Sequence, residues 1–244
     1  VLMFDKPNQL IFYVNSALTG IGVLIALLTD FAVIGIIIAV CGALLIFDQF
    51  RQNKFAFTID DLKKILRVHD SSGSKATVTQ TQRTTACHSD NSEYWFRHIR
   101  AVGSVGNFRS NNGDLAEPIK ENDSYHVCMQ IPREIDMIRG SDLTLSYEYE
   151  DAFTQTEGLL SHTVDNDTRR LHLAVELPKG RTVSSARLFC KRNGTEESLL
   201  PPVISGETKI EADIKDPIVG AEYCLQWHWS EEGLIKKLGH FFRI

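Results

Sequence analysis

The chain has 244 residues, with 26 basic and 31 acidic side chains and a formal net charge of −5. The first fifty residues hold one lysine and three aspartates, so the remainder keeps 25 basic and 28 acidic residues. This near-balance is unlike a protein that binds duplex DNA through a broad positive field, although it leaves room for a local basic groove.

Two long apolar runs stand near the start of the chain, at residues 10–28 and 31–47. A bilayer core of ~30 Å needs about 20 helical residues, so each run is long enough to cross a membrane once. One continuous helix over both would be about 57 Å long, well beyond the hydrocarbon core. A cleavable signal peptide is disfavoured because a basic start and a small-residue cleavage site are missing. We therefore predict a transmembrane helical hairpin within residues 1–49.

The charges that flank the two runs predict the orientation of the hairpin. Lys6 precedes the first run, and five basic residues follow the second: Arg51, Lys54, Lys63, Lys64 and Arg67. The turn between the runs carries only Asp30. The positive-inside rule places both termini in the cytoplasm. We expect a multi-pass protein of the inner (plasma) membrane, with Asp30 on the far side.

A stripe of small and weakly polar residues follows the first apolar run at steps of three or four, which is one face of a helix. The predicted pore-lining residues are Asn15, Thr19, Gly22, Ala26 and Asp30. An asparagine within a span needs a partner or water. A single hairpin cannot enclose a channel, so the pore requires a homo-oligomer. The alternative is that the stripe packs the hairpin against itself.

The rest of the chain carries β-strand patterns. Ile65–Val68 and a Thr/Val-rich run over 76–85 flank Asp70–Gly73, which predicts a hairpin. Further runs with one apolar and one polar face follow at 95–99, 125–131, 143–149, 171–177, 188–190, 210–214 and 223–229. We predict a mainly antiparallel β domain, a sandwich or a barrel, in the cytosol.

Composition changes suggest how this domain is divided. At the start of the β domain, Thr58–Asp61 could instead cap a short helix. We predict a juxtamembrane linker at 50–59, a β-rich module at 60–164, a second, Ig-like β-rich module at 165–230, and an amphipathic helix at 231–244.

The search for chemistry yields no catalytic signature. The chain has no GxSxG, P-loop, GxGxxG or HExxH motif, and the spacing of Ser161, His162 and Asp165 does not establish a triad. We expect no enzyme and no cofactor. The cysteines form no CxxC pair, so no metal site is expected. Cys190 falls on an apolar face, whereas Cys128 and Cys224 fall on polar ones, which indicates reduced thiols.

The most suggestive polar cluster spans residues 94–100. Alternation puts Trp95 and Arg97 on one face of a strand, and the other face holds Tyr94, Phe96, His98 and Arg100. Aromatic faces beside guanidinium groups suit nucleotides or single-stranded nucleic acid. The predicted ligand-binding residues are Trp95, Arg97, His98 and Arg100. The alternative is that Trp95 points to the core and the arginines are solvated.

The apolar spans 10–28 and 31–47, followed by the strand-rich part 60–230, resemble membrane effectors of bacterial nucleotide-signalled anti-phage defence. Several of these join a short N-terminal transmembrane hairpin to a cytosolic β-rich sensor. The resemblance is architectural and has no residue motif. It implies an oligomeric effector whose sensor binds a nucleotide or oligonucleotide and controls membrane integrity or ion flux.

Two alternatives remain open. One is a membrane-anchored β-sandwich adaptor that binds a protein partner, in which the hairpin is only an anchor. The other is an assembly subunit of a larger membrane complex.

Overall fold

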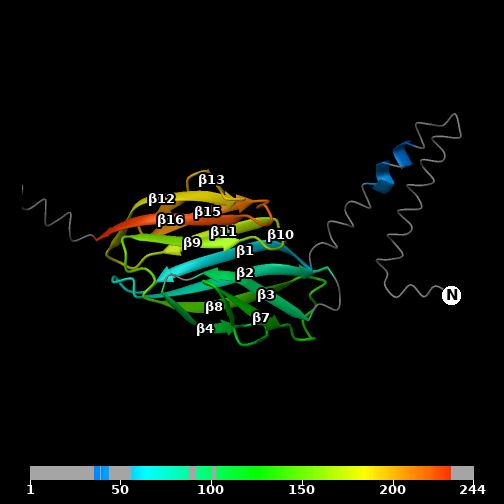
Figure 1. The fold of residues 1–244 in the computed structure, drawn as a ribbon, viewed down its shortest axis with the longest axis horizontal. Helices are drawn as coiled ribbons and strands as arrows, with labels where there is room; N and C mark the ends of the chain where they lie inside the picture. The colour runs from blue at the N-terminus through cyan, green and yellow to red at the C-terminus, as the bar shows by residue number, and fades with distance from the viewer. Residues whose placement is uncertain (1–35, 39, 44–55, 88–91, 101–102, 232–244) are drawn as a thin grey trace, which may run out of the picture. The chain divides into compact units, whose positions relative to one another are not determined.

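The computed structural model describes residues 36–38, 40–43, 56–87, 92–100 and 103–231 (Figure 1). The chain divides into two units, Val1–Ala56 and Phe57–Ile244. In the first unit, the described residues 36–38 and 40–43 are helical.

The predictions about the membrane concern residues that are mostly outside the described ranges. Within those ranges, no helix has the length and apolar character needed to cross a bilayer. The five predicted pore-lining residues (Asn15, Thr19, Gly22, Ala26 and Asp30) and residues 232–244 of the predicted C-terminal helix also lie outside them.

The second unit consists of three β-sheets. Sheet A contains β1 (Phe57–Val68), β2 (Lys75–Ala86), β4 (Ser104–Ser110), β8 (Ser141–Glu150), β10 (Asp167–Thr168), β11 (Arg170–Glu176), β14 (Val203–Ser205) and β15 (Lys209–Lys215). Sheet B contains β3 (Glu93–Arg100), β5 (Asp114–Leu115), β6 (Ile119–Glu121) and β7 (Ser124–Gln130). Sheet C contains β9 (Glu157–Thr163), β12 (Arg181–Arg192), β13 (Thr195–Ser198) and β16 (Glu222–Glu231).

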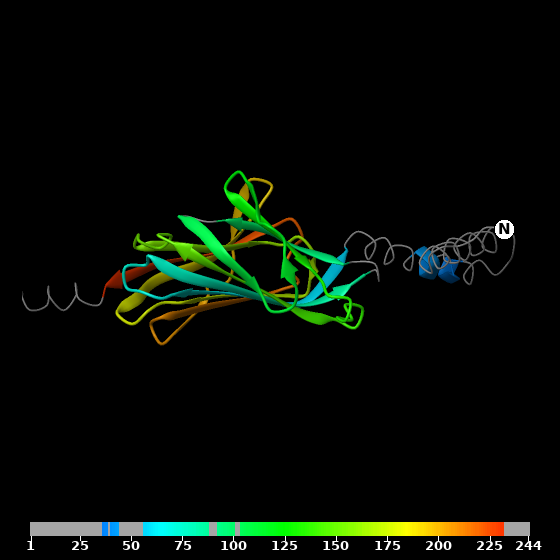
Figure 2. The same ribbon diagram turned by 90° about the horizontal axis from the view of Figure 1, so that it is seen from below.

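The sheets are mainly antiparallel, which confirms the β part of the predicted fold class. Sheet A has the order β14-β15-β11-β1-β2-β8-β4, with β10 beside β1. The predicted hairpin is β1–β2, and the carboxylate of Asp70 in its turn accepts hydrogen bonds from the backbone N–H groups of Ser74 (3.1 Å) and Lys75 (2.8 Å). Figure 2 shows the same unit from a perpendicular direction.

Strand β1 also has parallel neighbours, which the sequence patterns did not predict. It pairs in parallel with β10 and β11. Because β11 belongs to the stretch 165–230 and β1 to the stretch before it, the two expected modules share sheet A. The structure therefore places residues from 57 onward in one unit.

Sheets B and C lie side by side over one face of sheet A. Lys64 of β1 reaches Ser161 of sheet C, and Gln82 of β2 hydrogen-bonds Tyr94 of sheet B. Leu62 is paired directly opposite Gln82 and is two residues from Lys64, so Lys64 and Gln82 share a face. One hydrophobic core joins buried side chains of all three sheets.

Two local predictions need correction. Strand β1 begins at Phe57, inside the expected linker 50–59, and Thr58–Asp61 is extended rather than helical because β1 pairs there with β2 and β10. Cys128 and Cys224, placed by alternation on polar faces, are buried like Cys190.

Candidate functional site

Strand β3 carries all four predicted ligand-binding residues, and its regular pleat breaks at the middle. Its register against β7 shifts between Phe96 and Ile99, and His98 has a φ of 55°. An extra residue in one strand re-aims the side chains that follow it. Ile99 is consequently in the core and Arg100 is exposed. The predicted alternation therefore fails after Phe96, and His98 and Arg100 do not continue the buried face.

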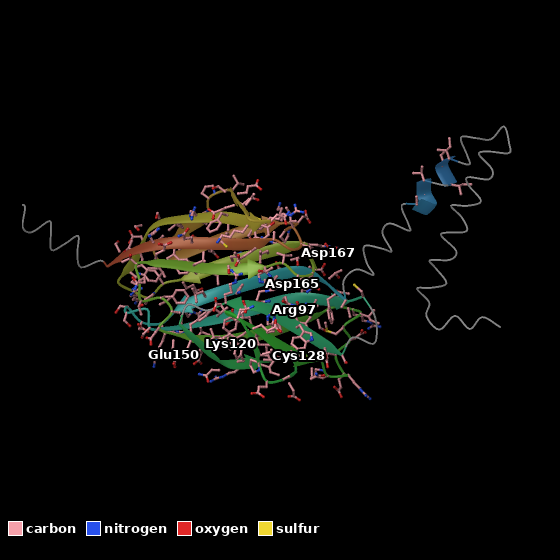
Figure 3. All side chains as sticks on the ribbon, viewed as in Figure 1. Arg97, Lys120, Cys128, Glu150, Asp165 and Asp167 are labelled. Carbon is pink, nitrogen blue, oxygen red and sulfur yellow. The ribbon has the colours of Figure 1, made fainter. Side chains whose placement is uncertain are left out.

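At this bulge, β3 meets the loop that follows β9. Nε2 of His98 lies 3.4 Å from Oδ1 of Asp165, and the rings of His98 and His126 are 5.5 Å apart in an edge-on arrangement. Burial raises the pKa of Asp165, and the charges of His98 and Arg97 oppose that rise. Figure 3 shows Arg97 and Asp165 near each other. The carboxyl group thus has three basic side chains around it.

A second charged group lies where β1 faces β9. Lys64 is only 4% exposed, and its Nζ donates a 2.8 Å hydrogen bond to the backbone carbonyl of Ser161. Burial lowers the pKa of Lys64 to about 8, although the carboxylate of Glu222 acts in the opposite direction. Burial, with the charges of Lys64 and His98, lowers the pKa of the neighbouring His162 to about 3.

An ion pair joins sheets B and C at the end of β3. Nη1 of Arg100 lies 3.1 Å from Oε1 of Glu222 in β16, and the Glu222 side chain is 14% exposed. The hydroxyl of Tyr149 donates a 2.5 Å hydrogen bond to the Arg100 carbonyl. We call the line of contacts where β3 and β1 meet the β9–β16 side of sheet C the seam; its titratable residues are Lys64, Arg97, His98, Arg100, His162, Asp165 and Glu222.

The seam opens into a cavity of about 320 Å³ beside Arg100. Its aromatic walls are Tyr149 and Phe153, and its charged lining residues are Arg100, Lys191, Asp123, Glu157 and Glu222. The cavity is therefore bipolar, with two cationic and three acidic groups, and is not a uniformly basic groove. Such a lining suits a small ligand with both an anionic group and several hydrogen-bond donors.

The seam is linked to the first residues of the β unit. Nδ2 of Asn166 donates to the hydroxyl of Tyr94 (3.4 Å), and the Tyr94 ring packs edge-on against Phe57 with 5.0 Å between centroids. The next two residues after Asn166 form β10, which pairs with Thr58 and Ile59 of β1. A displacement of the loop around Asp165 would therefore act directly on the start of β1.

The structure brings three of the predicted ligand residues to the seam. The charges of His98 and Arg97 oppose the rise in the pKa of Asp165, and Arg100 lines the cavity. Trp95 is half-buried and lies opposite Cys128 within sheet B. Sequence reasoning missed Lys64 and Glu222. The signal for Lys64 was its phase, since it stands between Leu62 and Leu66 on the apolar face of β1.

Within the described ranges, no group of three His, Cys, Asp or Glu side chains is arranged to hold a metal ion.

Comparison with known proteins identifies no family. No family model matches the chain, and no curated protein matches it. An M1 zinc metallopeptidase mutant from Deinococcus radiodurans, with a Tyr-Ser-Ala substrate, is 10% identical with a TM-score of 0.40 over 70% of this chain and 42% of that one. Native leukotriene A4 hydrolase from Saccharomyces cerevisiae is 11% identical with a TM-score of 0.40 over 71% of this chain and 30% of that one. The chain spans less than half the length of either protein, and likeness at this level carries no information about activity.

Proposed function

We propose that the chain is a homo-oligomeric membrane channel or pore-forming effector in anti-phage defence, gated by a nucleotide or short oligonucleotide bound to the cytosolic β domain. The observation that carries the ligand site is the cavity at the seam, where Arg100 and Lys191 face the same space as Tyr149 and Phe153. The apolar runs 10–28 and 31–47 supply the membrane part of the proposal.

The Arg100–Glu222 pair gives the ligand a way to favour one state. A phosphate group is a strong acceptor for a guanidinium group, so it competes with the Glu222 carboxylate for Arg100. When the phosphate replaces Glu222 as the partner of Arg100, the ion pair that joins β3 to β16 is broken. A ligand shifts an equilibrium only by binding the two states differently, and this exchange is such a difference.

The acidic residues of the cavity limit the ligand class. Glu157 and Asp123 would repel an extended polyanion, whereas the amino groups of a base or the hydroxyls of a ribose can donate to them. The site thus suits a single nucleotide unit, with its phosphate at Arg100 and Lys191. An oligonucleotide would place only one unit in the cavity.

The path from the cavity to the membrane part runs along the chain. The loop that carries Asp165 continues into β10, and β10 pairs with the first residues of β1. Strand β1 follows directly on the first unit in the sequence. Movement of the Asp165 loop would therefore change the position of the residues at which the chain enters the β unit. The hairpins of several subunits would then repack around Asn15 and Thr19.

The first experiment is reconstitution of the full chain into dye-loaded liposomes after its subunit number has been determined in mild detergent. Mononucleotides, dinucleotides and short oligonucleotides are added in turn. We expect a defined ring with ligand-dependent ion flux. Sealed liposomes and a monomer under every condition would refute the channel and leave the anchored adaptor.

Matched variants separate the two parts of the proposal. Leucine at both Asn15 and Thr19 should abolish flux without loss of nucleotide binding. Arg100→Ala should weaken nucleotide binding, whereas Arg139→Ala, which removes an exposed guanidinium paired with Asp136, should not. Equal nucleotide affinity in Arg100→Ala and the wild type would refute the seam site.

Exchange of residues 1–49 for an unrelated hairpin tests the adaptor directly. If the protein is a channel, replacement of its hairpin abolishes ion flux. If it is an anchored adaptor, the protein with the unrelated hairpin keeps its cellular activity.

A further inference from the structure

The bulge in strand β3 brings two histidines of sheet B together. The register of β3 against β7 shifts between Phe96 and Ile99. Two residues of β3, Arg97 and His98, therefore lie opposite the single residue His126 of β7. The rings of the two histidines meet edge-on, with 5.5 Å between their centroids. The extra residue of the bulge thus creates a contact between two side chains of the kind that titrates near neutral pH.

The backbone of His98 is strained at this point. Its φ of 55° lies in the left-handed region, which few residues other than glycine adopt without cost. In this conformation Nε2 of His98 lies 3.4 Å from Oδ1 of Asp165, in the loop that follows β9. Strained residues occur often in switch regions, where the surrounding contacts hold them in place. The strain makes His98 a candidate for such a role.

Carboxylates stand at both ends of the histidine pair. Nε2 of His126 lies 3.7 Å from Oε2 of Glu121 on β6, and His98 contacts Asp165. The His126 side chain is 15% exposed and that of Asp165 is 29% exposed, so solvent screens these charges only in part. The order of the four groups is carboxylate, imidazole, imidazole, carboxylate. Each ring therefore has an acidic partner with which it forms an ion pair when it takes up a proton.

The charge on the two rings changes near neutral pH, because an unperturbed histidine has a pKa of about 6.5. Burial raises the pKa of Asp165, and when both rings are neutral the charge of Arg97 opposes this rise. Protonation of His98 and His126 adds two further charges that favour the carboxylate. The two imidazolium charges repel each other, and the carboxylates on either side offset this repulsion.

The basic groups on the neighbouring strands keep their charge in the same pH range. His162 on β9 faces the charges of His98 and Lys64, and its pKa is lowered to about 3, chiefly by burial, so it stays neutral. Burial lowers the pKa of Lys64 on β1 to about 8, so Lys64 stays charged below pH 7. Among the basic groups of the cluster, His98 and His126 therefore change charge between pH 7 and pH 5.5.

We propose that His98, His126 and Asp165 form a proton-controlled latch, which holds the loop 164–166 against sheet B when the pH falls below about 6.5 and releases it above that value. This loop continues into β10, which pairs with the first residues of β1. The backbone N–H of Arg169 also donates a 2.9 Å hydrogen bond to the carbonyl of Ile59. The latch thus makes the hold on the start of β1 depend on pH, with or without a nucleotide.

Hydrogen exchange of the full chain in mild detergent, followed by mass spectrometry and corrected for the intrinsic exchange rates, tests the latch. Peptides that cover residues 164–169 are compared at pH 7.0 and pH 5.5, and the ratio of the two protection factors is formed. A partly exposed ion pair shifts a local opening equilibrium by at most about fivefold. We expect the ratio of protection at pH 5.5 to that at pH 7.0 to be about two- to fivefold higher in the wild type than in His98→Asn.

The variants are matched so that each removes one feature. His98→Asn removes the titrating ring, and asparagine tolerates the left-handed backbone, so the bulge is kept. Asp165→Asn removes the partner charge and should lower the ratio as His98→Asn does. His172→Gln is the control, because His172 on β11 also faces two carboxylates, at 3.6 Å and 3.0 Å, but stands outside the seam. It should show the wild-type ratio.

The same ratio in the wild type and in His98→Asn would overturn the latch, and so would a wild-type ratio in Asp165→Asn. The effect of His162 is common to all these proteins, so it does not account for a difference between them. The measurement uses neither nucleotides nor liposomes. Absence of ion flux would therefore refute only the channel, and equal exchange ratios would refute only the latch.

Discussion

Replacement of the buried Lys64 by methionine is expected to remove a pH-dependent part of the stability. Burial lowers the pKa of Lys64 from 10.5 to about 8. Each factor of ten in a protonation constant corresponds to ~1.4 kcal/mol, so the difference is worth about 3 kcal/mol. The folded chain releases this proton near pH 8, whereas the unfolded chain keeps it up to about pH 10.5. Between these two pH values the unfolded state therefore binds more protons than the folded state. The free energy of unfolding therefore rises with pH in this window by up to about 3 kcal/mol.

Methionine has a similar shape and no charge to desolvate, so Lys64→Met lacks this rise. At neutral pH we expect the variant to be at least as stable as the wild type, because removal of a buried charge offsets the lost hydrogen bond to the Ser161 carbonyl. The assay is urea unfolding of the full chain in mild detergent at pH 7.5 and pH 10, followed by tryptophan fluorescence. Trp227 and Trp229, both buried, report on the core.

The neighbouring residue provides the control. Lys63 points to the opposite face of β1, its side chain is 56% exposed, and it lies 3.4 Å from Asp61. Lys63→Met should leave the pH dependence of the wild type unchanged. The same rise between pH 7.5 and pH 10 in the wild type and in Lys64→Met would refute the assignment of that rise to Lys64.

Three further outcomes are expected in the same unfolding assay. Gly158→Ala should destabilise the β unit by about 1–3 kcal/mol because its Cβ would lie 2.2 Å from the Trp227 ring, whereas Gly106→Ala, with nothing within 4 Å, should be tolerated. His98→Val should be less stable than His98→Asn by about 1 kcal/mol, since β-branched residues tolerate a φ of 55° poorly; equal stabilities would contradict the bulge. The pKa of His162 is lowered from 6.5 to about 3, so the unfolded state alone takes up this proton as the pH falls. Between pH 7 and pH 5 the wild type should lose up to about 2 kcal/mol of stability that His162→Gln retains. Equal losses of stability in the wild type and in His162→Gln would contradict the assignment of this loss to His162.

Local patterns were sufficient to place most strands. Alternation over 143–149 predicted β8, and its apolar residues Leu143, Leu145 and Tyr147 are all fully buried. Strand phase is a local property, because successive side chains point to opposite faces of a sheet. The same rule failed at Arg97–His98, where a bulge inserts a residue that alternation cannot anticipate.

The charged residues of the seam illustrate what alternation leaves open. The sequence singled out Arg97, His98 and Arg100 by composition, but it did not indicate their partners. Arg100 and Glu222 are 122 positions apart, and Lys64 and Ser161 are 97 apart. Each contact depends on the order of strands in the sheets, including the parallel pairing of β1 with β11.

The sequence by itself determined the two apolar runs and the β class of the rest, because hydropathy over about 20 residues and period-2 alternation are both read within a short stretch of chain. Only the tertiary structure decided that sheets B and C share one face of sheet A, and hence that the end of β3 meets β9 and β16. A site made at the junction of three sheets depends on contacts between distant residues, and those are fixed by the packing of the whole unit rather than by any local pattern.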